Sequence, residues 1–351
     1  MSKFPKDKHT LTEGLEDGLD RRGFLRLAGA SMLGVAASPM IARSAAAASV
    51  SGSAKAGGYP TRPINLICPY GAGGGSDQLD RTVSAYAKKT LGVPMPVQNV
   101  PGGGGAIGLA KLAGSPPDGY TIASLIADNV CSLAFAKQPW NMDQVTGICR
   151  LMNVPSFYFS NAKGKFKTIQ EVIAAAKAKP GAIRVGTDGR NSVDELTSLI
   201  VGMKAGVKFR LVPFSKPAER YTSLLNGEVD ILYEQAGDVA RYIESGQFRP
   251  LVIFSKTKLD QLPKVPTSES LGWPVYFSQY RGIVAPAGTP SAIQKTLFGA
   301  LQEWGKSDAY KAFIKKQYMT ADSFQGPAFF RNEIQENLKQ FKKAIKETGL
   351  A

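Results

Sequence analysis

From Tyr59 onward, short apolar runs alternate with segments in which apolar residues recur at helical spacing. Buried strands that alternate with amphipathic helices are typical of βαβ units, and therefore of largely parallel sheets covered by helices. The pattern predicts strands at 64–68, 95–100, 121–127, 183–187, 208–214, 229–233 and 250–254. We therefore expect an α/β fold.

Three helices have recognisable starts. Apolar residues at helical spacing between the first two strands predict a helix from Gln78, with Ser76 or Asp77 as its N-cap. Thr168 and Glu171 have the spacing of a capping box and predict a second helix. The dipeptide at 289–290 places a proline at a helix start, and the pattern from there to Ala351 is helical.

The first 48 residues differ from the rest of the chain. Arg21 and Arg22 precede a moderately apolar stretch that ends in small residues, which is the layout of an export signal. The arginine pair is typical of a twin-arginine signal. The alternative is a membrane anchor, but Arg26 and Pro39 interrupt the stretch, which falls short of the roughly 18 apolar residues that a span needs.

We expect cleavage near 46–48, a flexible linker over 49–58, and a mature protein in the periplasm. Removal of residues 1–48 lowers the net charge from +15 to +13. A basic protein outside the cytoplasm favours small anionic ligands over nucleic acid. We therefore expect no nucleic-acid partner.

Histidine and cysteine usage limits the possible chemistry. The only histidine, His9, lies in the expected signal, which excludes Ser-His-Asp and Cys-His catalysis and histidine metal sites from the mature chain. Cys68, Cys131 and Cys149 have no C-x-x-C spacing, so they form either one disulfide, with 131 to 149 favoured, or buried thiols. The mature chain is therefore expected to have no histidine-based catalytic or metal site.

Two glycine-rich runs follow successive predicted strands: "ICPYGAGGGSD" at 67–77 and "NVPGGGGAIG" at 99–108. A loop between a strand and a helix start offers unpaired backbone N–H groups and the positive end of the helix dipole. Glycine lets an anion approach that backbone closely. Both runs are therefore candidate anion-binding loops, with flexible turns as the alternative.

A nucleotide is one candidate anion. Neither run has the lysine of a phosphate-binding P-loop, but Gly103, Gly105 and Gly108 satisfy the dinucleotide pattern G-x-G-x-x-G, with Asp128 about twenty residues beyond. This keeps open an exported NAD(P)-dependent oxidoreductase. Four consecutive glycines meet that pattern easily, and Pro101 favours an open loop, so this alternative is the weaker one.

Several motifs, in this order, resemble those of the tripartite tricarboxylate transporter substrate-binding proteins, the Bug family. They are the two glycine-rich runs with the preceding "YPTRPIN", then "PPDGYTIA" at 116–123, "LLNGEVDILYE" at 224–234 and "GIVAPAGTP" at 282–290. The likeness covers nearly the whole mature chain. It implies a two-domain periplasmic-binding-protein fold of a type II-like kind, in which each domain is a mixed, mainly parallel sheet flanked by helices.

The resemblance also implies a function. Such a protein is no enzyme and has no catalytic residue, metal or cofactor. It binds a small organic carboxylate in the cleft between its domains, closes by a hinge, and delivers the ligand to membrane permease subunits. We expect domain 1 to comprise 59–160 plus 251–351 and domain 2 to comprise 161–250, in a monomer. A sensory or chaperone partner with the same fold is a third class.

Carried over position by position, the resemblance implies these ligand-binding residues: Tyr70, Gly73, Gly74, Gly75, Ser76 and Asp77; Gly103, Gly104, Gly105 and Ala106; Asp128; Gly189, Asn191 and Ser192; and Glu234. We expect amides of the first two loops to hold a carboxylate and Tyr70 to pack on the ligand. Asp77 would repel a carboxylate, which favours an N-cap role for it. Glu234 suits an amine or a protonated group.

Gly189, Asn191 and Ser192 lie in the loop at 186–196, which we call the third loop. These residues and Glu234 have an alternative role, since each is equally suited to capping a helix or facing solvent. This chain also departs from the family: Tyr70 replaces the usual phenylalanine, Cys68 lies in the first strand, and Glu195 stands where relatives often carry histidine. Dicarboxylates, tricarboxylates, aromatic acids and amino acids therefore all remain candidate ligands.

Overall fold

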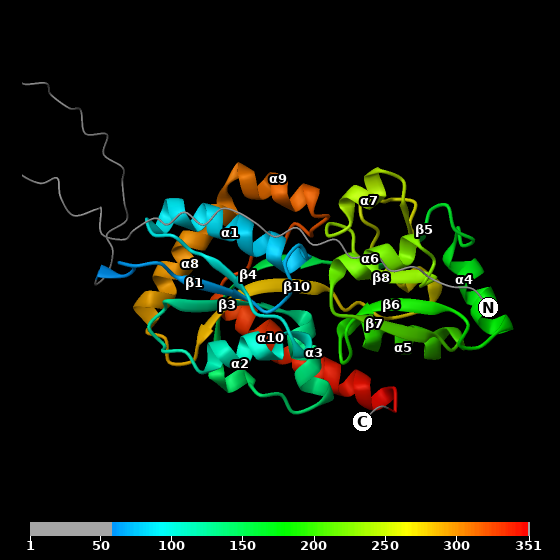
Figure 1. Ribbon diagram of the computed structural model, residues 1–351, viewed down its shortest axis with the longest axis horizontal. Helices are drawn as coiled ribbons and strands as arrows, with labels where there is room; N and C mark the ends of the chain where they lie inside the picture. Colours follow the sequence, from blue (N-terminus) through cyan, green and yellow to red (C-terminus); the bar gives the residue numbers. More distant parts are fainter. Residues whose placement is uncertain (1–57, 350–351) are drawn as a thin grey trace, which may run out of the picture. The chain divides into compact units, whose positions relative to one another are not determined.

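The computed structural model describes residues 58–349, which form two five-stranded sheets in the orders β2-β1-β3-β10-β4 and β7-β6-β8-β5-β9 (Figure 1). The strands are β1 Asn65–Cys68, β2 Val97–Asn99, β3 Thr121–Ile126, β4 Val145–Val154, β5 Ser156–Asn161, β6 Arg184–Asp188, β7 Arg210–Phe214, β8 Ile231–Gln235, β9 Phe248–Ile253 and β10 Gln279–Pro286. All seven strands predicted from the sequence are confirmed, within two residues at each end.

Helices flank both sheets, which confirms the expected α/β class (Figure 1). They are α1 Gly75–Leu91, α2 Ala106–Ala113, α3 Ala127–Phe135, α4 Ile169–Ala178, α5 Val193–Ala205, α6 Pro217–Leu225, α7 Ala240–Glu244, α8 Ser291–Lys306, α9 Asp308–Lys316 and α10 Pro327–Glu347. We call the first sheet with its helices the first lobe (58–154 and 279–349) and the second sheet with its helices the second lobe (156–253).

Three strands, β4, β5 and β10, were not predicted. β10 pairs antiparallel with β3 and β4, and β5 pairs antiparallel with β8 and β9, so both sheets are mixed. β10 is buried along its length although it contains Gln279 and Arg281. Polar residues inside a buried strand break the apolar run that would otherwise predict it.

The chain passes between the sheets twice. The first passage is a single residue, Pro155, between β4 and β5, so the second lobe begins five residues before the expected boundary at 160. The second follows Ile253, where residues 254–278 lead back to β10 in the first sheet.

The starts of the helices test the predicted caps. α4 begins as expected, because Thr168 Oγ1 accepts the Glu171 N–H at 3.3 Å and the Glu171 carboxylate accepts N–H groups in return. The prediction for α1 was wrong, since Gly74 is its N-cap without a side-chain hydrogen bond. The helix starts three residues earlier than predicted, so Asp77 lies in its first turn.

The C-terminal prediction of continuous helix was also wrong, because residues 317–326 separate α9 from α10. Ser307 caps α9 and Gly326 precedes Pro327 at the start of α10, so local capping signals divide the helical stretch. Between these helices Gln325 pairs with Arg150 of β4, as its N–H and C=O each bond the arginine backbone at 3.0 Å. Pro290 is the N-cap of α8 and not its first residue.

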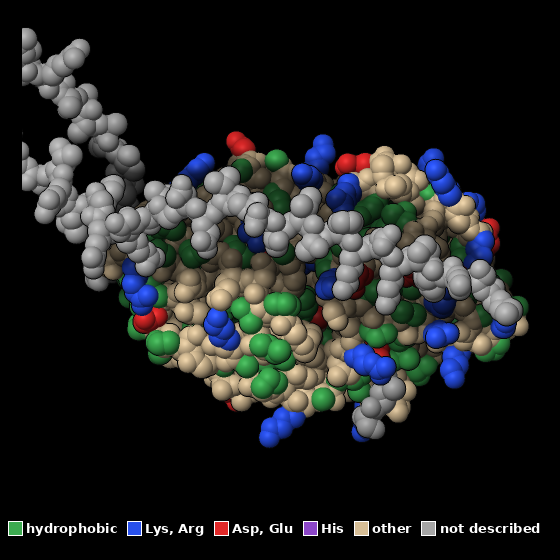
Figure 2. All heavy atoms as spheres, viewed as in Figure 1, with side chains coloured by type: hydrophobic (Ala, Val, Ile, Leu, Met, Phe, Trp, Pro, Cys, Tyr) green, Lys and Arg blue, Asp and Glu red, His purple; other side chains and the backbone are tan. Residues whose placement is uncertain are grey.

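Cys68, Cys131 and Cys149 are all buried free thiols, so the alternative of a 131–149 disulfide does not apply. Within residues 58–349, no helix has the length and apolar character needed to cross a membrane. Lys and Arg side chains are scattered over the visible face and do not gather in one patch (Figure 2). The expected signal at 1–48 and the linker up to residue 57 lie outside the described residues.

Candidate functional site

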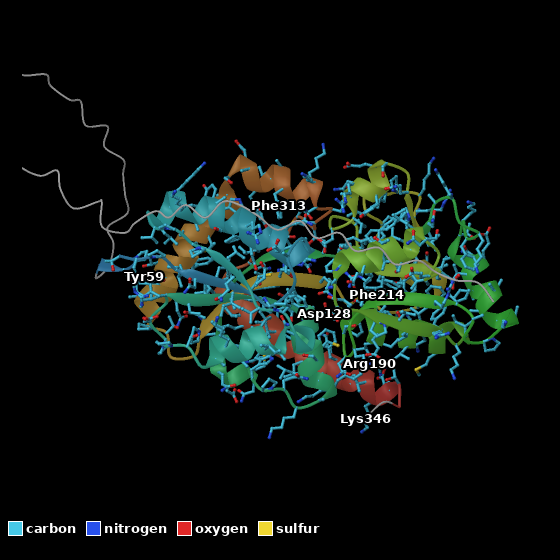
Figure 3. The ribbon with its side chains drawn as sticks, in the orientation of Figure 1. Tyr59, Asp128, Arg190, Phe214, Phe313 and Lys346 are labelled. Atoms are coloured by element: carbon cyan, nitrogen blue, oxygen red, sulfur yellow. The ribbon has the colours of Figure 1, made fainter. Side chains whose placement is uncertain are left out.

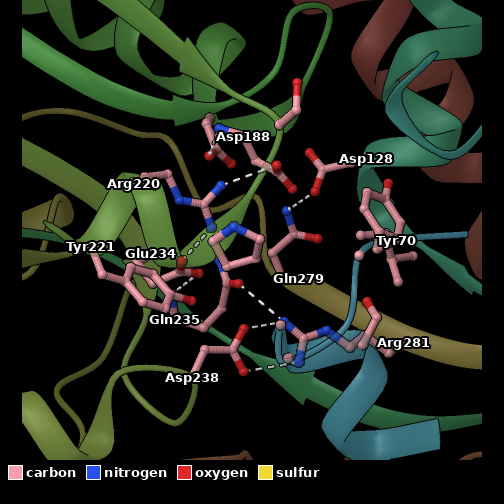
Figure 4. Close-up of a pocket in the computed structure, with 18 residues that line it drawn as sticks. Tyr70, Asp128, Asp188, Arg220, Tyr221, Glu234, Gln235, Asp238, Gln279 and Arg281 are labelled. Carbon is pink, nitrogen blue, oxygen red and sulfur yellow. Dashed lines mark hydrogen bonds and ion pairs between the residues drawn. The ribbon is translucent and has the colours of Figure 1, made fainter. Parts of the chain in front are cut away.

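A buried pocket lies where the two lobes meet (Figure 4). The first lobe lines it with Tyr70, Gly71, Gly74, Gly75, Ser76, Ile126, Asp128, Gln279 and Arg281, and the second with Asp188, Asp194, Ser215, Pro217, Arg220, Tyr221, Glu234, Gln235 and Asp238. Its volume is about 40 Å³, room for a few water molecules at about 10–15 Å³ each.

The pocket lies beyond the carboxyl ends of parallel strands in both sheets. Asp128 follows β3, Asp188 ends β6, and Glu234 is near the end of β8, while the first glycine-rich loop leads from β1 into α1. Ligands of open α/β sheets bind at this edge, because the loops that leave the strands converge there. Figure 3 shows Asp128 at the junction of the two lobes.

Hydrogen bonds and an ion pair join the lobes around the pocket. Arg281 of β10 bonds both carboxylate oxygens of Asp238, one of them at 3.0 Å from Nη1, and its Nη2 donates to Gln235 Oε1 at 3.3 Å. From the first lobe, Asp128 Oδ1 accepts the N–H of Val193, the first residue of α5, at 2.7 Å. A carboxylate at a helix N-terminus is stabilised by the helix dipole.

The second lobe has its own buried arginine. Arg220 of α6 is 4% exposed, pairs with Glu234, and has Nη1 at 3.1 Å from Asp188 Oδ1. The Nε–H groups of Arg220 and Arg281 are buried without a hydrogen-bond partner in the described part of the chain. Buried donors are normally satisfied, so these two indicate where an acceptor fits.

Negative charge exceeds positive charge in the pocket. Five carboxyl groups line it (Asp128, Asp188, Asp194, Glu234 and Asp238) against two guanidinium groups. Burial, and after it the charge of Asp188, raises the pKa of Asp128 to about 7. Burial and the charge of Asp128 likewise raise the pKa of Asp194, and burial raises that of Glu234.

The first glycine-rich loop contributes directly to the pocket. Tyr70, Gly74, Gly75 and Ser76 line it. The first hydrogen bond of α1 runs from the Gln78 N–H to the Gly74 carbonyl at 3.0 Å, so the N–H groups of residues 75–77 precede the helical ladder. Gly75 has no room for a side chain, because a β-carbon there would overlap the carboxylate of Asp238 from the other lobe.

Two of the predicted site residues in the same loop, Gly73 and Asp77, do not line the pocket. Asp77 Oδ2 accepts the Gly73 N–H at 2.9 Å, its Oδ1 accepts Asn99 Nδ2–H at 2.9 Å, and it pairs with Arg81. These contacts hold the loop in shape, and Asp77 is not the expected N-cap.

None of the four expected residues of the second loop, Gly103, Gly104, Gly105 and Ala106, lines this pocket. Two of their amides are used locally, since the Gly105 N–H donates to Gly102 and the Ala106 N–H to Gly103. The Gly104 carbonyl accepts from Tyr70 Oη at 3.1 Å and from Asn129 Nδ2 at 3.0 Å. The loop therefore supports Tyr70 from outside the pocket.

The third loop likewise caps a helix. Ser192 Oγ accepts the Glu195 N–H at 3.2 Å at the start of α5, and the Asn191 N–H donates to the Glu195 carboxylate. The Gly189 carbonyl accepts from Thr187 Oγ1 at 3.3 Å. The pocket is lined instead by the two acids that flank this loop, Asp188 and Asp194.

The sequence did not predict six charged or polar residues of the pocket: Asp188, Asp194, Arg220, Asp238, Gln279 and Arg281. A signal was available for Arg220, Gln279 and Arg281, because charged or polar residues interrupt otherwise apolar positions. Arg220 lies on the buried face of α6, and Gln279 and Arg281, two apart, lie on one face of β10. Asp238 follows β8 in a loop and carried no such signal.

The glycines that match the dinucleotide pattern include one, Gly108, that allows close packing of α2. Gly108 of α2 lies closely against Pro69, since a β-carbon at Gly108 would be only 3.0 Å from the proline Cα and Cβ. The adjoining loop is outside the pocket. Within residues 58–349, no three His, Cys, Asp or Glu side chains are grouped so as to hold a metal ion.

Two mixed sheets, each flanked by helices, with a buried polar pocket between the lobes, are the fold of two-domain solute-binding proteins. Residues 79–350 match the model of the tripartite tricarboxylate transporter family receptor, and the chain belongs to this family. The predicted membership of the Bug family and the predicted two-domain fold are thereby confirmed.

Individual relatives agree with this assignment. The chain is 31% identical over 346 residues to the "UPF0065 protein in gbd 5'region" of Cupriavidus necator, covering 95% of this chain and 99% of that protein. The periplasmic binding protein BugD has a TM-score of 0.77 at 24% identity, covering 83% and 99% of the two chains. MatC from Rhodopseudomonas palustris with bound malate has a TM-score of 0.76 at 22% identity, covering 82% and 100%.

Proposed function

We propose that this protein captures a small organic carboxylate in the periplasm and delivers it to the membrane permease of a tripartite transporter. It acts as a monomeric binding protein whose lobes open and close around the ligand, and it catalyses no reaction. Membership of the receptor family and the malate-bound neighbour MatC support a carboxylate as the ligand class. The pocket volume of about 40 Å³ is too small for a molecule such as malate, so the lobes must separate before such a ligand can enter.

One observation carries the proposal: two buried donors without partners belong to side chains that line the same pocket. The Nε–H groups of Arg220 and Arg281 lack acceptors in the described part of the chain, and the N–H groups at the start of α1 precede its ladder. A carboxylate accepts several hydrogen bonds at once and is favoured both by guanidinium groups and by a helix N-terminus. No observation on the second glycine-rich loop favours the NAD(P)-dependent oxidoreductase.

The route to the periplasm is part of the proposal. Arg21 and Arg22 with the following apolar stretch support twin-arginine export and cleavage near residues 46–48. Mass spectrometry of the protein recovered from the periplasm would test this, with a mature N-terminus after residue 46, 47 or 48 as the expected result.

Thermal unfolding with a panel of mono-, di- and tricarboxylates tests the binding function. A ligand at 100 times its Kd stabilises the folded state by about 2.7 kcal/mol, so a clear rise in Tm is expected for some members. NAD(P) should cause no rise. Stabilisation by no carboxylate would overturn the proposal.

A pair of arginine variants sharpens this test. Arg220→Lys keeps the charge but loses the Nε–H donor, so the ligand-induced rise in Tm should shrink. Arg62→Lys is the control, because Arg62 is 60% exposed in its side chain and pairs with Asp118 away from the pocket. It should leave the rise unchanged.

A further inference from the structure

We propose that the carboxylate ligand also carries a positively charged amino group, which binds the acidic side of the pocket formed by Asp128, Asp188 and Gln279. This inference rests on the proposed function and narrows its substrate class to compact zwitterions. Figure 4 shows the three side chains converging on one part of the pocket.

The first observation is an unpartnered acceptor. Gln279 is 2% exposed, and its Nε2–H donates to Asp128 Oδ2 at 2.6 Å. When Asp128 is ionised, only the amide nitrogen can donate to it, and this fixes the orientation of the amide. It leaves Gln279 Oε1 buried with no donor in the described part of the chain, in a side chain that lines the pocket. An ammonium group would supply that donor.

The second observation is the distribution of charge. Arg220 forms ion pairs with Glu234 and Asp188, and Arg281 forms an ion pair with Asp238. Within residues 58–349, Asp128 and Asp194 therefore have no cationic partner of their own; they accept hydrogen bonds from the backbone N–H groups of Val193 and Asp188 respectively.

This distribution disfavours a ligand that carries only carboxylates. Such a ligand would add negative charge to a buried pocket that already has an excess, and like charges repel strongly at low dielectric. A positively charged group beside Asp128 offsets that repulsion within the same molecule.

The protonation behaviour of Asp128 agrees with this geometry. Burial and the charge of Asp188 on β6 raise its pKa to about 7, while the Val193 N–H, the Gln279 amide and the charge of Arg220 on α6 oppose the rise. The pKa of the neighbouring Asp194 on α5 is raised as well, chiefly by burial. An ammonium group would favour the ionised form, so binding should release a proton near neutral pH. Affinity for such a ligand should therefore increase as the pH rises from about 5.5 to about 7.5.

The donors and the acceptors lie in one small pocket, which limits the separation of the two ligand charges. Arg220 Nε, Arg281 Nε and Gln279 Oε1 belong to side chains that line the same cavity of about 40 Å³. A ligand whose amino and carboxylate groups are a few bonds apart, as in an amino acid, suits this arrangement.

Matched pairs of hydroxy and amino acids with one carbon skeleton provide the test: lactate and alanine, malate and aspartate, 2-hydroxyglutarate and glutamate. Titration calorimetry of the wild-type protein should show the amino member binding at least tenfold more tightly in every pair that binds. Equal or tighter binding of the hydroxy member would overturn the inference and leave the proposed function standing. Binding of no carboxylate at all would overturn both.

Asp128→Asn tests the acidic side directly, because asparagine can still accept the Val193 N–H through its amide oxygen. The preference for the amino member should fall at least tenfold and its dependence on pH should disappear. The hydroxy member should bind more tightly than to the wild type, because one pocket carboxylate that repels it is removed. Asp308→Asn, at a side chain 95% exposed on α9, is the control and should retain both.

A second variant covers the case in which Asp128→Asn does not fold. Gln279→Met removes the unpartnered acceptor at similar volume and should weaken binding of the amino member about fivefold or more, with little change for the hydroxy member. An unchanged preference in either folded variant would contradict the inference.

Discussion

The two glycine-rich loops look alike in sequence but pack against different parts of the molecule. In the first loop, Gly75 meets the carboxylate of Asp238, which belongs to the second lobe. In the second, Gly105 meets Asn129 and Tyr70 of its own lobe. The absence of a side chain at Gly75 therefore permits contact between the two lobes. At Gly105 it permits a turn to pack against Tyr70 and Asn129 of the same lobe.

This difference separates two kinds of loop that a sequence pattern alone treats as equal. Residues of the first loop line the pocket, whereas the second loop fixes the Tyr70 ring through the Gly104 carbonyl. Substitutions in the first should change ligand affinity, and those in the second should chiefly change stability.

Gly75→Ala should have the largest effect. Its β-carbon would overlap Asp238 whenever the lobes are closed, and overpacking of this kind costs about 1–3 kcal/mol. Ligand affinity measured by calorimetry should fall about 5- to 150-fold, with little change in the Tm of the ligand-free protein if it is open. An unchanged Kd would show that the closed arrangement is not the binding form.

Gly105→Ala should mainly reduce stability. Gly105 has φ +90°, and a β-carbon there would overlap Asn129 Nδ2 and lie 3.3 Å from the Tyr70 ring. We expect the free energy of unfolding to fall by about 1–2 kcal/mol, measured by urea denaturation. Ligand affinity should fall less than in Gly75→Ala; a greater loss would place the second loop in the binding site.

Tyr70→Phe should have a smaller effect on stability. It removes the hydroxyl that bonds the Gly104 carbonyl and accepts from Asn129 Nδ2 at 2.9 Å, worth about 0.5–1.5 kcal/mol. The ring remains at the pocket wall, so the Kd should change less than threefold. A larger change would mean that the hydroxyl itself contacts the ligand.

Gly104→Asn should have the smallest effect. Gly104 has φ +63°, a conformation that asparagine tolerates, and no atom of the described residues lies within 4 Å of its β-position. Stability should change by less than about 0.5 kcal/mol and affinity by less than twofold. Loss of binding in this variant would restore the expectation that this loop holds the carboxylate.

Local patterns predicted much of the fold. The seven predicted strands and the capping box at Thr168 depend on neighbours a few residues apart, which a single sequence contains. β10 could not be predicted in the same way. Its Gln279 and Arg281 are tolerated in a buried strand only because Asp128 and Asp238, 151 and 43 residues away in the chain, satisfy them.

The site was predicted in part for the same reason. The first loop, Asp128 and Glu234 lie at strand ends, and the pocket contains them. The roles of Asp77 and Ser192 depend on the residue at which a helix begins. A shift of this start by a few residues decides whether a side chain caps the helix, stabilises the loop or lines the pocket. The partners of Arg220 and Arg281 could be identified only once both sheets were in place.

The passage at Pro155 has a consequence for how the lobes can move. With one residue between β4 and β5, any rotation of one sheet against the other must be absorbed by very few backbone torsions there. The proline ring holds one of these torsions near about −65°, so the freedom of the joint lies in its neighbours. The two lobes are thus joined by one short, stiff connection at Pro155 and by the longer segment 254–278. In the proposed opening, the short connection would limit the directions in which one lobe can rotate against the other.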